Sequence, residues 1–169
     1  MYKAIFGLLL LAAVCQGNEI RNGDFQSGLK HWLHNIKGLK VDPEVKAGNL
    51  PAVPIVGPGN IRQDVQLEPD TLYELTFMIK GEKINDASPS DLGARVQLQG
   101  GKVWRRVTGD NTGKCLTGSF DWKKIKTQFN TGTFKTGKIR VWMVLNTTGT
   151  CWVADFQLNK VESAPAAVK

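Results

Sequence analysis

Apolar and polar residues alternate along several short segments of this chain, and this period of two is typical of β-strands with one buried face. Between Leu72 and Lys80, the odd positions from Tyr73 to Ile79 are apolar or aromatic, and the positions between them are mostly polar. Between Lys138 and Asn146, the odd positions from Ile139 to Leu145 repeat the pattern. No segment of convincing length shows a helical period, so the chain is predicted to be all-β.

Each strand of this kind has one apolar side to bury, which predicts a β-sandwich of roughly eight to ten strands in two packed sheets. Five further residues with the same alternation are assigned to the core: Val65, Leu67, Ala94, Val96 and Leu98. Three segments rich in glycine, proline or polar turn residues are predicted to be surface loops. They are Leu50–Asn60, Gly81–Gly93 and Gly109–Ser119.

The first residues include a charged one, Lys3, which is followed by a short apolar run that includes Leu8 to Leu11. This is the pattern of a secretory signal peptide. We predict a signal peptide over residues 1–17, a folded domain over residues 18–161 and a disordered tail over residues 162–169. The product is expected to be secreted and extracellular, with lipidation of Cys15 as the alternative. No apolar stretch is long enough to span a membrane.

The size and charge of the domain limit its functions. About 150 residues leave room for one core and for no separate catalytic domain. Lys and Arg outnumber Asp and Glu by 22 to 15, and the formal net charge is +7. This surplus is compatible with an anionic partner such as an acidic polysaccharide, although scattered basic residues are more typical of a merely solvated surface. No dense basic cluster appears, and nucleic acid is not expected as a partner.

Two segments carry a resemblance to a known family. Asn22-Gly23-Asp24-Phe25, followed by Gly28 and Trp32, combines a tight Asn-Gly turn with two large apolar anchors. The segment Cys151–Leu158 is an aromatic and aliphatic strand that carries an aspartate. Together they resemble the opening and closing signatures of the jelly-roll carbohydrate-binding modules of families 4, 9 and 22 and their galactose-binding-like relatives. The resemblance covers roughly residues 19–161 and implies a non-catalytic carbohydrate-binding sandwich.

Sugar binding requires flat aromatic surfaces for the C–H faces of the ring, together with planar amides and guanidinium groups for its hydroxyls. If the odd positions of Lys138–Asn146 are buried, Arg140 and Trp142 point outward, and the same parity applies to two other segments. The candidate carbohydrate-binding residues are Trp104, Trp142, Arg95, Gln97, Gln99, Arg106 and Arg140. The alternative is that Trp104 and Trp142 are buried. Trp32 and Trp122 are assigned to the core, and Trp152 is left unassigned.

The resemblance also implies a structural calcium ion with oxygen ligands from the first and last strands. Glu19, Asp24 and Asp155 could supply carboxylates, but two positions that carry acids in the family are Gln26 and Ala154 here. A weakened calcium site is one expectation. The alternative is that Asp24 caps a turn and that Asp155 binds backbone amides. No cofactor is expected to be required.

Two cysteines remain after the signal peptide, Cys115 and Cys151, and an exported protein is expected to join them in a disulfide. Two free buried thiols are the alternative. Asn146-Thr147-Thr148 is an acceptor triplet for glycosylation at Asn146 in a eukaryotic secretory pathway.

The residues for catalysis are hard to find in this sequence. His31 and His34 are not spaced like a metal pair on a helix, and no serine or cysteine lies in a nucleophile motif. The leading prediction is therefore a secreted, lectin-like protein that binds a polysaccharide or glycan. The first alternative is a structural, matrix or adhesive protein with the same fold, and the second is a jelly-roll glycoside hydrolase or polysaccharide lyase.

Overall fold

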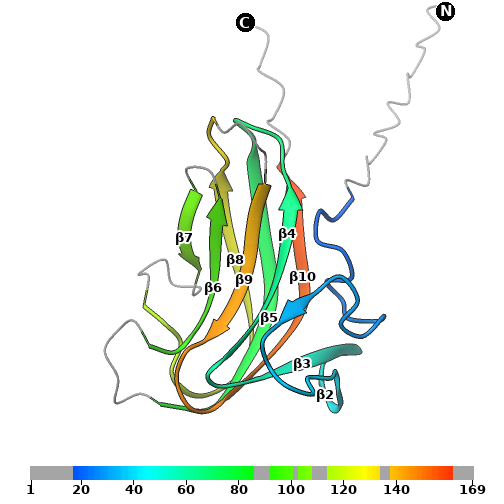
Figure 1. The fold of residues 1–169 in the computed structure, drawn as a ribbon, viewed down its shortest axis with the longest axis vertical. Coiled ribbons are helices and arrows are strands. Elements are labelled where there is room, and N and C mark those ends of the chain that lie inside the picture. The colour runs from blue at the N-terminus through cyan, green and yellow to red at the C-terminus, as the bar shows by residue number, and fades with distance from the viewer. Residues whose placement is uncertain (1–16, 86–91, 101–102, 108–113, 134–137, 162–169) are drawn as a thin grey trace, which may run out of the picture.

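The computed structural model describes residues 17–85, 92–100, 103–107, 114–133 and 138–161. Their regular structure consists of ten β-strands in two five-stranded sheets packed face to face (Figure 1). In spatial order, the first sheet contains β1 (Leu33–His34), β4 (Gly59–Gln66), β9 (Lys138–Leu145), β6 (Ala94–Gly100) and β7 (Val103–Val107). The second contains β2 (Asp42–Ala47), β3 (Leu50–Val56), β10 (Thr150–Lys160), β5 (Leu72–Ile84) and β8 (Gly118–Asn130).

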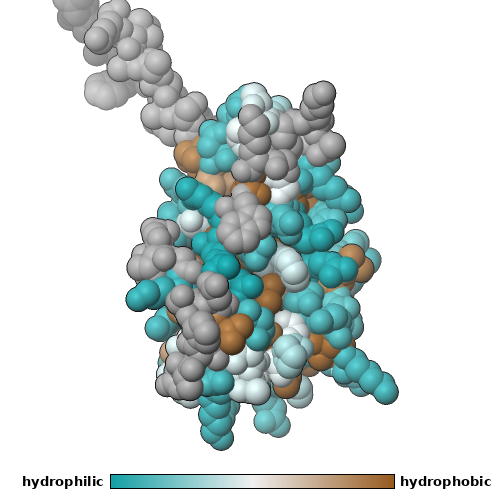
Figure 2. Space-filling model, turned by 60° about the vertical axis from the view of Figure 1, so that its left-hand side comes forward, coloured by the Kyte–Doolittle hydropathy of each residue, from teal (hydrophilic) through white to brown (hydrophobic). Residues whose placement is uncertain are grey.

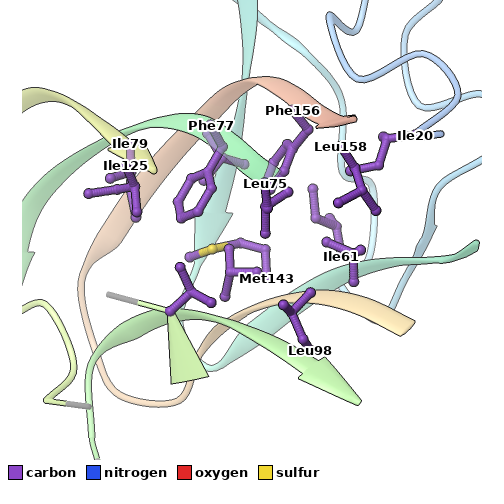
Figure 3. Packing of buried hydrophobic residues seen from close by; sticks show 14 of the residues in the cluster. Ile20, Ile61, Leu75, Phe77, Ile79, Leu98, Ile125, Met143, Phe156 and Leu158 are labelled. Atoms are coloured by element: carbon purple, nitrogen blue, oxygen red, sulfur yellow. The ribbon is translucent and has the colours of Figure 1, made fainter. Parts of the chain in front are cut away.

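The core lies between the two sheets, as the alternation predicted. The odd residues of β9 from Ile139 to Leu145 are all 0% exposed, and those of β5 from Tyr73 to Ile79 are at most 1% exposed. Figure 3 shows how side chains from both sheets meet, with Met143 of β9 opposite Leu75 and Phe77 of β5. The five further residues assigned to the core are buried too. The predicted all-β, two-sheet sandwich is confirmed.

An aromatic cluster attaches the segment before β1 to the last strand. The Phe156 ring of β10 lies 5.2 Å from the Trp32 ring, 6.2 Å from Phe25 and 5.1 Å from Phe77, measured between ring centroids. Trp32 also donates its indole N–H to the carbonyl of Asn22 at 3.1 Å. Trp32 is therefore a core residue, as predicted, and the opening and closing signatures pack against each other.

Leu50–Asn60 is not a surface loop, because it forms β3 and the start of β4. Its prolines are compatible with a strand because each half of β3 pairs on one side only. Leu50 to Ala52 pair with β2, whereas Val53 to Val56 pair with β10. Proline has no N–H to donate to a neighbouring strand. Because each half of β3 has a paired strand on one side only, prolines are tolerated there.

The other two predicted loops are shorter than expected. Residues 81–84 belong to β5, and residues 118–119 belong to β8, because this long pair of strands continues across two register shifts. Parts of both predicted loops, at residues 86–91 and 108–113, lie outside the described residues. The predicted signal peptide, apart from Gly17, and the predicted tail lie outside them as well.

Trp122 is not a core residue. It is half-buried in a separate small cluster, where it packs with Met78 and Trp152 against alanines of β2, β3 and β10. A register shift between β5 and β8 precedes this point, and it reverses which side of β8 faces inward. The sequence periodicity could not reveal this bulge.

The predicted disulfide between Cys115 and Cys151 is not formed in the structure. Cys151 lies on the inner side of β10 and is fully buried, and this burial raises the pKa of its thiol. Cys115 lies before β8, where its Sγ atom accepts a hydrogen bond from Nη1 of Arg95 at 3.5 Å. One thiol thus points into the core and the other contacts an arginine of the first sheet. No helix in the described ranges is long and apolar enough to cross a membrane.

Gly23 allows the closest contact between the opening segment and β10. A Cβ atom at this position would lie 2.0 Å from the carbonyl oxygen of Phe156, whose N–H donates to the carbonyl of Gly23 at 2.9 Å. We expect Gly23→Ala to lower the free energy of unfolding by about 1–3 kcal/mol, because the added methyl group forces the strands apart. Urea denaturation followed by tryptophan fluorescence measures the change. Ser27→Ala, at an exposed position of the same opening segment, is the control. An unchanged midpoint for Gly23→Ala would contradict this account.

Candidate functional site

The outward side of the first sheet, called the outer face below, carries a row of side chains that crosses all five strands. The strand register places Leu33 of β1, Arg62 of β4, Trp142 of β9, Gln97 of β6 and Arg106 of β7 next to one another in this order. Neighbouring strands lie about 4.8 Å apart, so four steps give a row of roughly 19 Å. A row of this length is sufficient for several sugar units of an extended chain.

Two shorter rows flank the first. One contains Asp64, Arg140, Gln99 and Trp104, and the other contains Asn60, Val144 and Arg95. The four neighbouring strands β4, β9, β6 and β7 therefore contribute one outward arginine each. Viewed from the β7 side, the surface shows many hydrophilic side chains with small hydrophobic areas among them (Figure 2).

All seven predicted binding positions lie in these three rows. Trp142 is partly exposed, so the alternative that it is simply buried is wrong. Gln97 is 7% exposed and lies deep between its neighbours. The position of Trp104 in β7 is described, but its side chain lies outside the description.

β1 and β4 also contribute to the outer face, which the alternation did not predict, and they add Leu33, Asn60, Arg62 and Asp64. The pattern of β4 was concealed by Gln63, a polar residue at an inward position between Ile61 and Val65. Its buried side-chain amide accepts from the N–H of Arg21 at 2.8 Å and donates to the carbonyl of Arg21 at 3.0 Å. A buried glutamine is thus satisfied by the opening segment, and Arg62 and Asp64 on either side of it point outward.

Asp64 is held by two cations of β9. Nε of Arg140 donates to its Oδ1 atom at 2.8 Å, Nη2 donates to Oδ2 at 3.3 Å, and Nζ of Lys138 lies 3.3 Å from Oδ2. The hydrogen bonds from Arg140, which outweigh the effect of burial, lower the pKa of Asp64. These three residues line a shallow depression of about 330 Å³ together with Gln99 and Gly100.

Some buried polar atoms of the outer face, on β4 and β9, form no hydrogen bond within the described part of the chain. They are Nε1 of Trp142, Nε of Arg62 and Oδ1 of Asn60. Buried polar groups without a partner are rare in folded proteins, and each calls for an explanation. Trp152 provides the contrast, because its indole N–H donates to Oδ2 of Asp42 at 2.9 Å on the other sheet. Two donors and one acceptor at the centre of the outer face thus have no partner within the described chain.

The predicted calcium ligands do not come together as a set. Asp24 and Asp155 line the same depression beside Gly23, whereas Glu19 lines a different one. The carboxylate of Asp24 accepts from the N–H of Gln26 at 3.2 Å, and that of Asp155 accepts from the Gln157 amide at 2.7 Å. Among the described residues, no three His, Cys, Asp or Glu side chains are grouped so that they could hold a metal ion. The residues present do not fit the expected site.

The remaining polar candidates take no part in the outer face as described. His31 and His34 are exposed. Asn146 is half-buried, and its Oδ1 atom accepts from the N–H of Gly93 at 2.9 Å. Its glycosylation stays a prediction.

The ion pairs of Asp64 make a pH-dependent contribution to the stability of the fold, and this contribution can be measured. We expect the carboxyl carbon of Asp64 to titrate below the usual value of about 3.9 in an NMR experiment, and Arg140→Gln to move this midpoint upward. The pairs therefore stabilise the fold above about pH 4, and this contribution is lost as the pH falls through the lowered pKa. Arg62→Gln, which removes a charge that does not bond Asp64, is the control. A midpoint at or above 3.9 in the unmodified protein would contradict the geometry.

Comparison with known proteins shows the fold. No protein-family model matches the sequence, and no curated protein matches it. A solved structure described as a family 16 carbohydrate-binding module aligns with a TM-score of 0.63 at 21% identity, over 86% of this chain and 100% of its own. The CBM22-2 xylan-binding domain of Paenibacillus barcinonensis Xyn10C aligns with a TM-score of 0.60 at 13% identity, over 82% of this chain and 97% of its own.

A third solved structure is an enzyme. The enzymatically active domain of tailspike protein 4 of bacteriophage CBA120 aligns with a TM-score of 0.63 at 11% identity, over 85% of this chain. This chain spans only 21% of that protein's length. At these identities the likeness concerns the fold alone, and the chain has the jelly-roll fold of the carbohydrate-binding modules.

Proposed function

We propose that this protein binds a polysaccharide or glycan chain across the outer face of its first sheet and that it does not cleave the chain. The observation that carries the proposal is the row of side chains across five strands, with the partly exposed Trp142 at its centre. Arg62 and Gln97 flank the indole on the two neighbouring strands. The row combines an aromatic surface with planar donors and acceptors, which is the combination that a sugar ring requires.

The proposed pose follows from this arrangement. A pyranose ring packs its C–H face on Trp142, and its hydroxyls bond the amides and guanidinium groups of Gln97, Gln99, Arg95, Arg106 and Arg140. Nε1 of Trp142, Nε of Arg62 and Oδ1 of Asn60 receive partners from the ligand. Ligand binding would thus satisfy atoms that the described chain leaves without a hydrogen bond.

The comparisons support the class of ligand. One neighbour is described as xylan-binding, and another as a module in complex with β-1,4-galactotriose. We extend carbohydrate binding from them to this chain, and leave the identity of the sugar to experiment. The pattern of the first residues supports a signal peptide, and we therefore place the protein outside the cell.

The two alternatives have less support. A purely structural or adhesive protein would have no need for a partly exposed indole whose N–H is without a partner in the described chain. A hydrolase of the usual kind needs two carboxylates across the scissile bond. Among the described outward residues of β4, β9, β6 and β7, the only carboxylate is Asp64, and Arg140 and Lys138 hold it in ion pairs.

Trp142→Ala tests the proposal. We expect the unmodified domain to be retarded in native gels that contain its polysaccharide, in a panel of neutral and acidic polymers. Trp142→Ala should weaken this binding at least about tenfold, or 1.4 kcal/mol, because the ring loses its stacking surface. Trp104→Ala is expected to act in the same direction.

Trp122→Ala is the matched control, because it removes a half-buried indole from the other sheet. Circular dichroism and thermal unfolding show whether each variant is folded. A folded Trp142→Ala protein that binds as tightly as the unmodified one would exclude this face. No binding to any polymer of the panel would favour the structural or adhesive alternative.

A further inference from the structure

We propose that Arg62 binds a carboxylate or sulfate group of the ligand, so that the protein recognises an anionic polysaccharide. This inference rests on the proposed function and adds the chemical class of the chain and the residue that distinguishes it. Arg62 is the register partner of Trp142 on the neighbouring strand, so a sugar that stacks on the indole has this arginine beside it.

The charges of the outer face favour an anion. The neighbouring strands β4, β9, β6 and β7 contribute one outward arginine each, and β9 adds Lys138 at its start. The single described carboxylate among these outward side chains is Asp64, which is already shared between Arg140 and Lys138. Arg62, the cation next to Trp142 in the central row, is therefore not neutralised by Asp64.

Arg62 is the least satisfied of these cations. It forms no ion pair with any described residue, and its Nε atom is buried without a hydrogen-bond partner. A partly buried charge is costly unless it is paired, and a guanidinium pairs best with a planar carboxylate or a sulfate through parallel hydrogen bonds. A neutral hydroxyl would satisfy the hydrogen bond but would leave the charge without a partner.

The neighbours of Arg62 fit the rest of an acidic sugar. Trp142, the register partner of Arg62, carries a second donor, Nε1, and an oxyanion has several lone pairs for more than one donor. Oδ1 of Asn60 lies two residues away on the same side of β4 and needs a donor, which a ring hydroxyl provides. Leu33, on the other side of Arg62, is 59% exposed and offers an apolar contact at the rim. An acidic sugar has each of these groups, whereas a neutral one lacks the anion.

The test uses matched polymers that differ only in charge. Binding of the mature domain is measured by affinity electrophoresis and calorimetry with dextran against dextran sulfate, and with hydroxyethyl cellulose against carboxymethyl cellulose. Polygalacturonate is added as a natural carboxylate polymer. The sulfated and carboxylated arms distinguish the two sources of the anion.

Three variants assign the effect to Arg62. Arg62→Gln should weaken binding to the preferred anionic polymer at least about tenfold while leaving any binding to neutral polymers within about twofold. Arg62→Lys should recover part of the loss, because it restores the charge without the planar fork. Lys124→Gln removes one positive charge from the exposed outer side of β8 in the second sheet and should have no effect.

The outcomes separate this inference from the proposed function. Preference for an anionic polymer that is lost in Arg62→Gln but kept in Lys124→Gln supports both. Equal losses in these two variants would show that only net charge matters and would overturn the assignment to Arg62. Binding to neutral polymers alone would overturn the anionic class while the proposed function stands, and no binding to any polymer would overturn both.

Discussion

The candidate site depends on the strict alternation of β9 at the centre of the first sheet. Its inward residues are completely buried, so a shift of its register by one position would place Arg140 and Trp142 in the core and four apolar side chains in water. Burying a guanidinium without a partner is prohibitively unfavourable. The hydrophobic core therefore holds the indole and the arginine outward, and β4 and β6 on either side are aligned to them by the same hydrogen-bond ladders.

The opening segment supports this arrangement from the other end of the sandwich. Phe25 and Trp32 pack around Phe156, and Gly23 permits a backbone contact with β10 that no side chain could allow. The same segment supplies Arg21, whose backbone satisfies the buried amide of Gln63. The signature that resembles the opening of carbohydrate-binding modules is thus a structural anchor, and through Gln63 it steadies the strand that carries Arg62.

The two outward sides of the sandwich differ in how their indoles are satisfied. On the second sheet, Trp152 and Trp122 lie over small alanines, and the indole N–H of Trp152 is bound to Asp42. That bond and the backbone N–H groups of Val45 and Glu44 lower the pKa of Asp42, with Val45 making the largest contribution. On the first sheet, the indole N–H of Trp142 has no partner among the described residues. Packing and the bond to Asp42 account for Trp122 and Trp152, whereas the proposed ligand would supply the partner of Trp142.

The sequence by itself determined the all-β class, the inward sides of β5 and β9, and the outward positions of the seven candidate binding residues. Alternation is a local property, and it can be read along one strand without knowledge of its neighbours. It failed at β3, where prolines suggested a loop. The resemblance to the family's core tryptophan failed at Trp122, which packs in the separate cluster of the second sheet. Only the tertiary structure decided that β4 lies next to β9, that Arg62 and Asp64 join the outer face, and that the two cysteines stay apart. Strand pairing depends on contacts between residues distant in sequence, and such contacts leave no local pattern.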